Sequence, residues 1–579
     1  MLKRIPRLLL WMGMLVFTGC SPNYMNLAEL NYQKLAHRYS DFTDLPPLPV
    51  IFLPGMKGSQ IVKCNNDREW NDHWPCEQKD EIDVWGTSGN VALFRKYDDL
   101  MLAYQFGKIA KEFGTPGETI PNVSDYKRRR IKEGALLDSY RVGWTGFIFE
   151  NFDIYGRLKA FLIEKAGYKE GKNLFFMPYD WRLDNRITAV KLALKIQNYR
   201  KQYTENLKAE FLTGQRVRSC RGVKSNDFDE YWACVRRVYR QFFNEDGEIK
   251  FILVAHSMGG LVARYFVNVL QGGRDIQKLI LMGVPVFGSV DALYGLREGE
   301  FPETFLGELL NLRFYSQGST RTILFSMPSA FQLLPTYEAS IAGKTLKELG
   351  LDIVAPLDLS SFEGGSENQI FRNYLNFKII PGYFRFQKYY PIAETLYHHF
   401  AAKMLLAYLK SAQCFHRATD INRDRKTAVS DMTNCEEYER VAEAERFVKD
   451  TDETVKGIKI SIAERVKTKG DPATEIATKV KTTITFSGHC QPTRTRARFD
   501  DENRTVVFET KSTTNKNDAA SDLEELVEEL GDGRVSIFST GVHLPGQISD
   551  FYFIMCESHV GLVSNPAFQY NLIRELRIN

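Results

Sequence analysis

Residues 251–266 read FILVAHSMGGLVARYF, and this stretch decides the fold. An unbroken apolar run at 251–255 predicts a buried strand, and the pattern after the turn is helical. Ser257 lies in the turn, in the pattern Ala-x-Ser-x-Gly, a variant of the Gly-x-Ser-x-Gly turn that presents a nucleophilic serine. Small residues are needed two positions to either side because the backbone is crowded there, and Ala255 and Gly259 meet this need. The stretch therefore predicts a serine hydroxyl raised above the end of a sheet.

Other short apolar runs resemble this strand, and long helical patterns such as 187–207 separate them. Because these runs do not alternate apolar with polar residues, they predict strands buried on both faces of a parallel sheet. The predicted fold class is α/β, and the serine turn makes it an α/β-hydrolase fold with a mostly parallel sheet. The runs are at 49–53, 173–177, 250–256, 278–284, 377–380 and 534–538.

Composition suggests how the chain is divided. Residues 46–411 are expected to form most of the α/β-hydrolase core, with an aromatic-rich cap or lid at about 85–150 that has few clear strands. Residues 412–520 are rich in charge and alternate apolar with polar residues in places, which is typical of half-buried antiparallel strands. We interpret them as a solvated β insertion before the last strand, and residues 521–579 as the C-terminal part of the core.

The N-terminus has the features of an export signal. Residues 1–20 combine three basic residues with an apolar stretch at 8–17, which is shorter than the roughly 20 residues of a membrane-spanning helix. The segment ends in Phe-Thr-Gly-Cys20, which resembles a bacterial lipobox, although Leu is usual at the Phe position. The pattern predicts a signal peptide, a lipid on Cys20, a tether at 21–45 and a place in the cell envelope as an outer-membrane lipoprotein. A signal cleaved without lipidation is the alternative.

Cysteine usage agrees with export. Of the nine cysteines, eight remain when Cys20 is set aside, and an even number in an exported chain indicates disulfides. No Cys/His cluster has the spacing of metal ligands, so we expect neither a metal nor an organic cofactor. Among the possible pairings, the simplest joins neighbours: Cys64–Cys76, Cys220–Cys234, Cys414–Cys435 and Cys490–Cys556.

A nucleophilic serine needs a base and a carboxylate that orients this base. In this fold type the expected chain order is Ser, Asp, His. His559 lies near the C-terminus, where the last loop of the sheet would deliver the base, and His543 is the rival candidate. His256 directly precedes the serine and is expected to point away from the turn, whereas the histidines at 398–399 lie in a helical pattern.

Asp532 is the candidate acid, because flanking glycines permit a tight turn beside the run at 534–538. A Gly-Asp-Gly turn with no catalytic part is the alternative. Two backbone N–H groups are expected to bind the oxyanion, one from the residue after the serine and one from the loop after the first strand. The candidates are the amides of Met56 and Met258.

Several motifs together resemble the lecithin:cholesterol acyltransferase family, which includes phospholipid:diacylglycerol acyltransferases and lysosomal phospholipase A2. They lie at about 48–340 and 525–570, and they are PVIFLPGMKGSQ, IYGRLKAFLIEKAGYKEGKNLFFMPYDWR, VAHSMGG, VPVFGS, PSAFQLLP, GDGRV and SHVGLVSNP. The resemblance implies a triad and a pair of oxyanion amides at the residues chosen above: Ser257, Asp532 and His559, with Met56 and Met258.

The sequence departs from the family pattern in three places: Ala255 replaces Gly, Arg534 stands where Thr is usual, and the insertion at 412–520 is foreign. None removes a catalytic group, but the insertion leaves the acyl acceptor and the partners open. The pair Cys64–Cys76 resembles the family's small disulfide loop near the lid. The two Trp residues in this loop are expected either to enter a bilayer surface or to pack on the cap.

The motif Tyr179-Asp180-Trp181-Arg182 is expected to shape the pocket. The spacing of Asp180 and Arg182 predicts an internal ion pair beside a packed Trp, and direct contact with a lipid head group is the alternative.

Composition and charge exclude several classes of protein. Hydrophobic residues make up 44% and charged residues 26%, which excludes a disordered chain and a multi-span membrane protein. Lys and Arg total 76 against 72 acidic residues, so we expect no nucleic-acid partner. The expected partners are a phospholipid substrate and a membrane surface, reached through the lipid anchor and the lid.

The residues and the resemblance together predict a serine-dependent lipid acyl hydrolase or O-acyltransferase that acts on glycerophospholipid esters through an acyl-enzyme. The alternatives are a secreted carboxylesterase on other esters and a non-catalytic envelope scaffold.

Overall fold

The computed structural model describes about half of the chain. The described residues are 47–64, 81–86, 131–144, 147–223, 227–298, 326–335, 437–451, 480–494, 496–500, 505–509, 531–537 and 548–577, with single positions and runs of two or three residues between them. The predicted signal peptide, Cys20 and the predicted tether lie outside these residues, as do the apolar run at 377–380, His543 and the histidines at 398–399.

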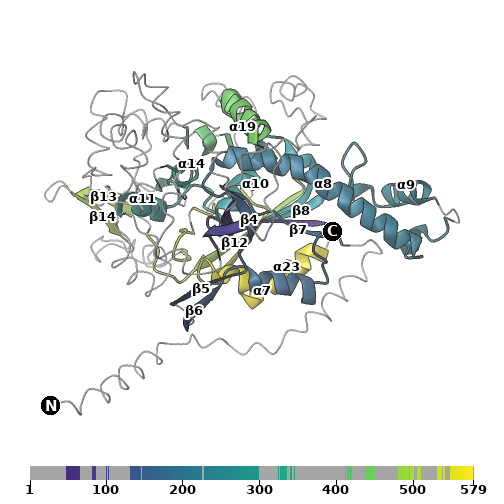
Figure 1. Ribbon diagram of the computed structural model, residues 1–579, viewed down its shortest axis with the longest axis horizontal. Helices are drawn as coiled ribbons and strands as arrows, with labels where there is room; N and C mark the ends of the chain where they lie inside the picture. Colours follow the sequence, from purple (N-terminus) through teal and green to yellow (C-terminus); the bar gives the residue numbers. More distant parts are fainter. Residues whose placement is uncertain are drawn as a thin grey trace, which may run out of the picture.

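A six-stranded sheet forms the centre of the protein (Figure 1). Every pair of neighbouring strands in it runs parallel. The two strands in its middle, β8 and β9, are buried along their whole length, as expected for strands covered on both faces. The predicted α/β class is therefore confirmed. In sheet order the strands are β15 (Phe551–Cys556), β12 (Thr482–His489), β9 (Ile276–Met282), β8 (Phe251–His256), β1 (Val50–Leu53) and β7 (Leu174–Phe176).

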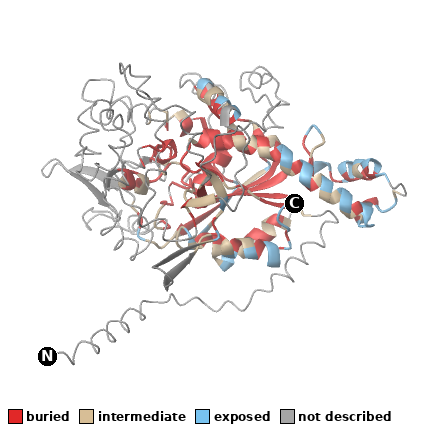
Figure 2. Ribbon diagram, viewed as in Figure 1, coloured by how far each residue is buried: buried red, intermediate tan, exposed pale blue. Residues whose placement is uncertain are grey.

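Helices cover both faces of the sheet. Figure 1 shows α8, α10 and α19 on one face and α7 and α23 on the other. The buried residues of the sheet and of the inner helix surfaces form one apolar core, drawn red in Figure 2. These helices are α7 (Gly156–Ala160), α8 (Asn185–Leu212), α10 (Met258–Asn268), α19 (Glu437–Thr451) and α23 (Pro566–Arg577). Outside residues 59–153, the smaller described elements are α9 (Phe228–Val238), α11 (Val290–Glu298), α14 (Pro328–Phe331), β10 (Ser340–Ile341), β11 (Lys344–Thr345), the π-helix Phe161–Lys165 and short 3-10 turns.

Residues 59–153, which include the cap predicted at about 85–150, contain more strands than the sequence indicated. A three-stranded antiparallel sheet has the order β3-β2-β4, and β5 and β6 form a separate antiparallel pair. Register shifts interrupt all three of these pairings, which breaks the regular alternation by which half-buried strands are recognised. The strands are β2 (Ser59–Cys64), β3 (Glu81–Trp85), β4 (Ile131–Leu136), β5 (Ser139–Trp144) and β6 (Phe147–Asp153).

The boundaries predicted for the β insertion, 412–520, are wrong, because β12 belongs to the central sheet. It pairs in parallel with β9 on one side and with β15 on the other. Its Thr485 and Ser487 are fully buried and are paired with hydroxyls of Ser549 and Thr540. Because these hydroxyls are paired, polar residues can alternate with apolar ones inside the core. The sequence of β12 therefore has the same alternating pattern as a strand with one face in solvent.

Helix α19, in the same segment, also belongs to the core. The carboxylate of Glu437 is buried, 2.5 Å from Nε of Arg186 on α8, and it accepts a hydrogen bond from the hydroxyl of Tyr265 on α10. A buried charge is tolerated only when it is paired in this way. Within 412–520, the antiparallel strands that the structure describes are β13 (Arg496–Asp500) and β14 (Thr505–Glu509), which form one hairpin before the last strand.

The run predicted as a strand at 534–538 does not join the central sheet in its described residues, 534–537, and the last strand that the structure describes is β15. Residues 531–536 make only isolated bridges, to Gln491 and within their own turn. β15 is at the edge of the sheet, and its Phe551 is 59% exposed.

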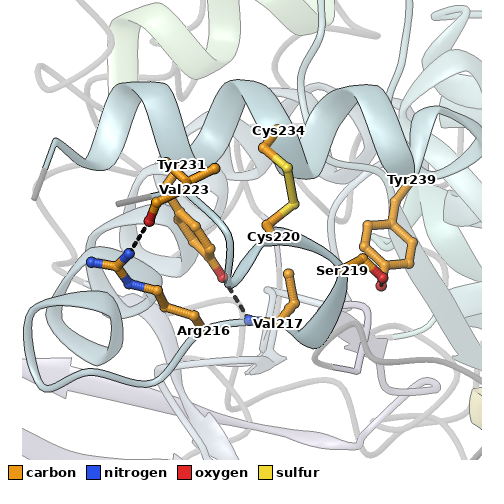
Figure 3. Close-up of a disulfide and its surroundings, with 8 residues drawn as sticks. All are labelled: Arg216, Val217, Ser219, Cys220, Val223, Tyr231, Cys234 and Tyr239. Carbon is orange, nitrogen blue, oxygen red and sulfur yellow. Dashed lines mark hydrogen bonds between the residues drawn. A yellow bond between two sulfur atoms is a disulfide. The ribbon is translucent and has the colours of Figure 1, made fainter. Parts of the chain in front are cut away.

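Helix α8 extends beyond the sheet, and α9 runs beside its outer part (Figure 1). The predicted disulfide Cys220–Cys234 is present there, and Figure 3 shows how the 3-10 turn at 218–220 is tied to α9. The backbone N–H of Val217 donates to the hydroxyl of Tyr231 at 3.1 Å beside this disulfide. Cys556 is a free, exposed thiol, so the prediction of a Cys490–Cys556 disulfide is wrong. The other two predicted pairs include residues outside the described part of the chain.

None of the helices described above has the length and apolar composition that crossing a bilayer requires.

Candidate active site

Ser257 lies between the end of β8 and the first residue of α10. Its backbone has φ 52° and ψ −130°, a conformation that non-glycine residues rarely adopt. The N–H of Ser257 donates to the carbonyl of Met282 at the end of β9. The strained turn brings the hydroxyl to the carboxyl ends of the parallel strands, where ligands bind in open α/β sheets.

Glycines make room for this turn. A Cβ on Gly259 would lie 2.4 Å from the carbonyl oxygen of Pro54, and one on Gly260 would lie 2.2 Å from Cγ2 of Val284. Helix α10 thus begins in direct contact with the ends of β1 and β9, which only residues without a side chain permit. The sequence pattern revealed the first of these glycines because Gly259 belongs to the Ala-x-Ser-x-Gly motif.

His559 joins Ser257 to Asp532. Its Nε2 lies 2.8 Å from Oγ of Ser257, and its Nδ1 lies 2.7 Å from Oδ2 of Asp532. The structure therefore brings the three residues proposed from the sequence into one hydrogen-bonded chain, although they come from three distant parts of the sequence. In such a chain, the imidazole can take the serine proton while the carboxylate holds the ring in the required tautomer.

Asp532 is held rigidly in a buried turn and is 2% exposed. Its Oδ1 accepts the backbone N–H groups of Arg534 and Val535, at 2.9 and 2.7 Å. Its backbone carbonyl accepts the N–H of His559 at 2.8 Å. Because Oδ1 is occupied by two N–H donors, Oδ2 is left to accept from the imidazole.

The loop after β1 lies directly against the serine. A Cβ on Gly55 would lie 2.8 Å from Cβ and 3.3 Å from Oγ of Ser257. Among the described residues, no group accepts a hydrogen bond from the backbone N–H of Met56 or of Met258. Met258 is also the first residue of α10, where the N–H groups and the helix dipole favour an anion. Two unused N–H groups beside a nucleophilic serine are what an oxyanion hole requires.

Replacement of Gly55 by Ala tests this close approach. The added methyl would push the loop away from Ser257, and a shift of about 1 Å at a reacting centre can cost on the order of 100-fold in rate. We expect kcat on a soluble ester to fall by at least about 10-fold while the protein stays folded. Gly222→Ala is the matched control because a Cβ there meets nothing within 4 Å. If Gly55→Ala and Gly222→Ala cleave the ester with equal kcat, the prediction that the loop must lie close to Ser257 is wrong.

Residues 179–182 hold the two ends of the loop after β1 by hydrogen bonds. The hydroxyl of Tyr179 donates to the carbonyl of Pro54 at 2.9 Å, and the indole N–H of Trp181 donates to the carbonyl of Ser59 at 3.0 Å. Asp180 and Arg182 form an ion pair of 2.6 Å in which both side chains are almost fully buried. Their burial favours the role of shaping the loop over contact with a lipid head group.

The sequence predicts that His256 points away from the site, but this prediction is wrong, because the structure places the ring against His559. Its ring centroid lies 4.9 Å from that of His559, and its Nε2 lies 3.0 Å from the carbonyl oxygen of His559. Its Nδ1 lies 2.8 Å from the hydroxyl of Tyr155. Burial, and then the neighbouring His559, lower the pKa of His256 to about 3, so the ring is neutral. Sequence reasoning missed this contact because the residue pattern does not show which face of β8 meets the C-terminal loop.

No group of three or more His, Cys, Asp or Glu side chains with the arrangement of a metal site occurs in the described part of the chain.

The family model for lecithin:cholesterol acyltransferase matches residues 218–542, which is more than half of the chain and includes Ser257 and Asp532. Among solved structures, a chain from the crystal structure of the Tle4-Tli4 complex is similar at 14% identity, with a TM-score of 0.39. The match covers 92% of this chain and 99% of that one. A search of the curated proteins gave no significant match.

Proposed function

The chain belongs to the lecithin:cholesterol acyltransferase family, and from this premise we propose that it is a serine-dependent enzyme that cleaves glycerophospholipid esters and transfers the acyl group. The family supports a lipid acyl hydrolase or acyltransferase. The observation that carries the finer proposal is the hydrogen-bonded chain from Ser257 through His559 to Asp532, with distances of 2.8 and 2.7 Å.

In the first half-reaction, Oγ of Ser257 attacks the ester carbonyl carbon while Nε2 of His559 takes its proton. Asp532 accepts the Nδ1–H of His559 and stabilises the imidazolium that forms. The backbone N–H groups of Met56 and Met258 hold the negative oxygen of the tetrahedral intermediate. When the intermediate collapses, His559 returns the proton to the departing lysophospholipid oxygen, and the acyl group stays on Ser257.

In the second half-reaction, His559 removes a proton from water or from a lipid hydroxyl, and the resulting nucleophile attacks the carbonyl carbon of the acyl-enzyme. The bond between that carbon and Oγ of Ser257 then breaks, and His559 returns the proton to Oγ. Water gives a free fatty acid and a lipid hydroxyl gives a new ester. The balance depends on how well the closed pocket excludes water and orients an alcohol.

Lipid mass spectrometry on vesicles tests the proposal. The vesicles contain phosphatidylethanolamine and phosphatidylglycerol with a sterol and a long-chain alcohol, and the Ser257→Ala variant is the control. We expect lysophospholipid with the unaltered protein alone. Free fatty acid beside it indicates a phospholipase, and sterol or alkyl esters indicate an acyltransferase. If small soluble esters are cleaved while every vesicle lipid stays intact, the enzyme is a carboxylesterase and the phospholipid proposal fails.

We propose further that a lipid on Cys20 holds the enzyme at the membrane that carries its substrate. The support is the lipobox-like ending of residues 1–20. Several acyl chains on one cysteine anchor a protein stably, whereas one chain does so only marginally. Membrane fractionation of cells expressing Cys20→Ala is the check, since that variant is expected to leave the membrane fraction.

A further inference from the structure

We propose that Tyr155 and His256 are positioning residues which hold the oxyanion loop and the general base at a fixed separation. They form a buried bridge between Gly55, which precedes one oxyanion amide, and His559. This inference rests on the proposed function, because it assigns the two residues to the same reaction. It adds a link that the triad and the oxyanion amides do not contain.

The bridge consists of three hydrogen bonds in sequence. The N–H of Gly55 lies 2.7 Å from the hydroxyl of Tyr155, which lies 2.8 Å from Nδ1 of His256. Nε2 of His256 lies 3.0 Å from the carbonyl oxygen of His559. The bridge therefore joins the loop after β1 to the loop after β15.

The direction of each hydrogen bond follows from the chemistry of the groups. A carbonyl oxygen only accepts, so Nε2 of His256 carries a proton and donates to His559. Because His256 is neutral, its Nδ1 is unprotonated and accepts the hydroxyl proton of Tyr155. The hydroxyl oxygen of Tyr155 in turn accepts the N–H of Gly55. All the donors and acceptors along the bridge are thus matched, with no proton left over.

Burial keeps this arrangement unchanged. Tyr155 is 2% and His256 is 5% exposed. The lowered pKa of His256 keeps it neutral at ordinary pH, and burial raises the pKa of Tyr155 above its usual value. An unmatched buried donor or acceptor is costly, so breaking one bond of the bridge disturbs its other members.

The bridge completes the support of His559. The imidazole is held by Ser257 and Asp532, and the backbone N–H of His559 donates to the carbonyl of Asp532. The bridge holds the remaining polar group, the backbone carbonyl. At its other end it holds the N–H of Gly55, the residue before Met56. The bridge therefore restrains the separation between the oxyanion loop and the general base. A catalytic group must be held to within about 0.5 Å of its productive position, and such supporting contacts supply this precision.

The experiment uses the full-length protein, a soluble p-nitrophenyl ester and titration of active serines with a fluorophosphonate. Tyr155→Phe removes the hydroxyl alone, and His256→Leu removes both ring nitrogens. We expect each to lower kcat per titrated site by about 10- to 100-fold, with KM little changed. The double variant is expected to be no slower than about the worse single variant, because both changes break the same bridge.

Two further variants separate positioning from general stability. Tyr168→Phe is the matched control, because Tyr168 is 1% exposed and its hydroxyl has no partner among the described residues; its kcat should not change. His256→Gln should recover part of the rate lost in His256→Leu, because the amide can again donate to the carbonyl of His559.

The positioning role is overturned if kcat per titrated site stays within about twofold in Tyr155→Phe and His256→Leu. It is also overturned if the loss appears only as fewer titratable sites, or if Tyr168→Phe loses as much. A different result would show that the proposed function is wrong: Ser257→Ala would keep the ester activity. In that case both the serine-dependent mechanism and the positioning role of Tyr155 and His256 would be rejected.

Discussion

Ser257→Ala is expected to lower kcat for ester cleavage by on the order of 10⁵- to 10⁶-fold. The acyl-enzyme forms on Oγ of Ser257, and in serine hydrolases the loss of the nucleophile costs about as much as the loss of the whole triad. The residual rate would come from the oxyanion amides and from binding alone. A soluble p-nitrophenyl ester is the substrate, so that membrane binding does not enter the measurement.

The fold should survive this change, because no described bond other than that to His559 depends on the hydroxyl of Ser257. Far-UV circular dichroism and thermal unfolding of the variant are expected to match the unaltered protein. Ser219→Ala, on the outer part of the α8–α9 region, is the control and should keep the full rate. If Ser257→Ala keeps more than about a hundredth of the rate, another group is the nucleophile.

Asp532→Asn is expected to lower kcat by about 10⁴-fold, an effect almost as large. Oδ1 of Asp532 accepts the N–H groups of Arg534 and Val535. An asparagine would keep its carbonyl oxygen at that position, since its NH₂ group cannot accept these bonds. The NH₂ would then face Nδ1 of His559, which would become an acceptor. The ring proton would move to Nε2, and the ring could no longer take the proton of Ser257.

The matched control for this prediction is Asp229→Asn, an exposed carboxylate in the first turn of α9. It should not alter kcat. A loss in Asp532→Asn of less than about 10-fold would mean that Asp532 does not set the tautomer of His559. A crystal structure or an NMR signal of the imidazole proton in the variant would show the tautomer directly.

The residues of the candidate site could be predicted from the sequence where a short sequence pattern determines their position. The turn around Ser257 needs small residues at fixed spacing, so the pattern alone located it. Asp532 and His559 followed from the chain order of the fold type and from the short loops that carry them. The apolar runs that became β1, β7, β8 and β9 were recognisable because buried parallel strands do not alternate.

Other features depend on tertiary contacts that no local pattern reveals. The sequence of β12 predicts a strand of the insertion, because Thr485 and Ser487 indicate a solvent-exposed face. In the structure each of these hydroxyls is paired with another hydroxyl inside the core. Glu437 lies in a charge-rich stretch whose composition predicts a solvated surface, whereas its carboxylate is buried against Arg186 and Tyr265. The sequence does not show the contacts of His256 either, because its partners Tyr155 and His559 lie far away in the chain.

The contact made by Gly55, in the loop after β1, also could not be predicted from the sequence. The place of this glycine in a turn was evident from the sequence, but its contact with Ser257 arises only when β1 and β8 pair side by side. Parallel pairing brings the carboxyl ends of these two strands to one edge, where the serine and the loop meet.

The central proposal, that Ser257 is acylated, is tested most directly by trapping the serine. The full-length protein is treated with a fluorophosphonate that carries a long acyl-like chain, and peptide mass spectrometry then locates the adduct. We expect one adduct per chain, on the peptide that contains Ser257, formed in step with the loss of ester activity. It should form far more slowly in Asp532→Asn. Complete labelling of another residue, or full ester activity in the protein labelled at Ser257, would contradict the acyl-enzyme mechanism.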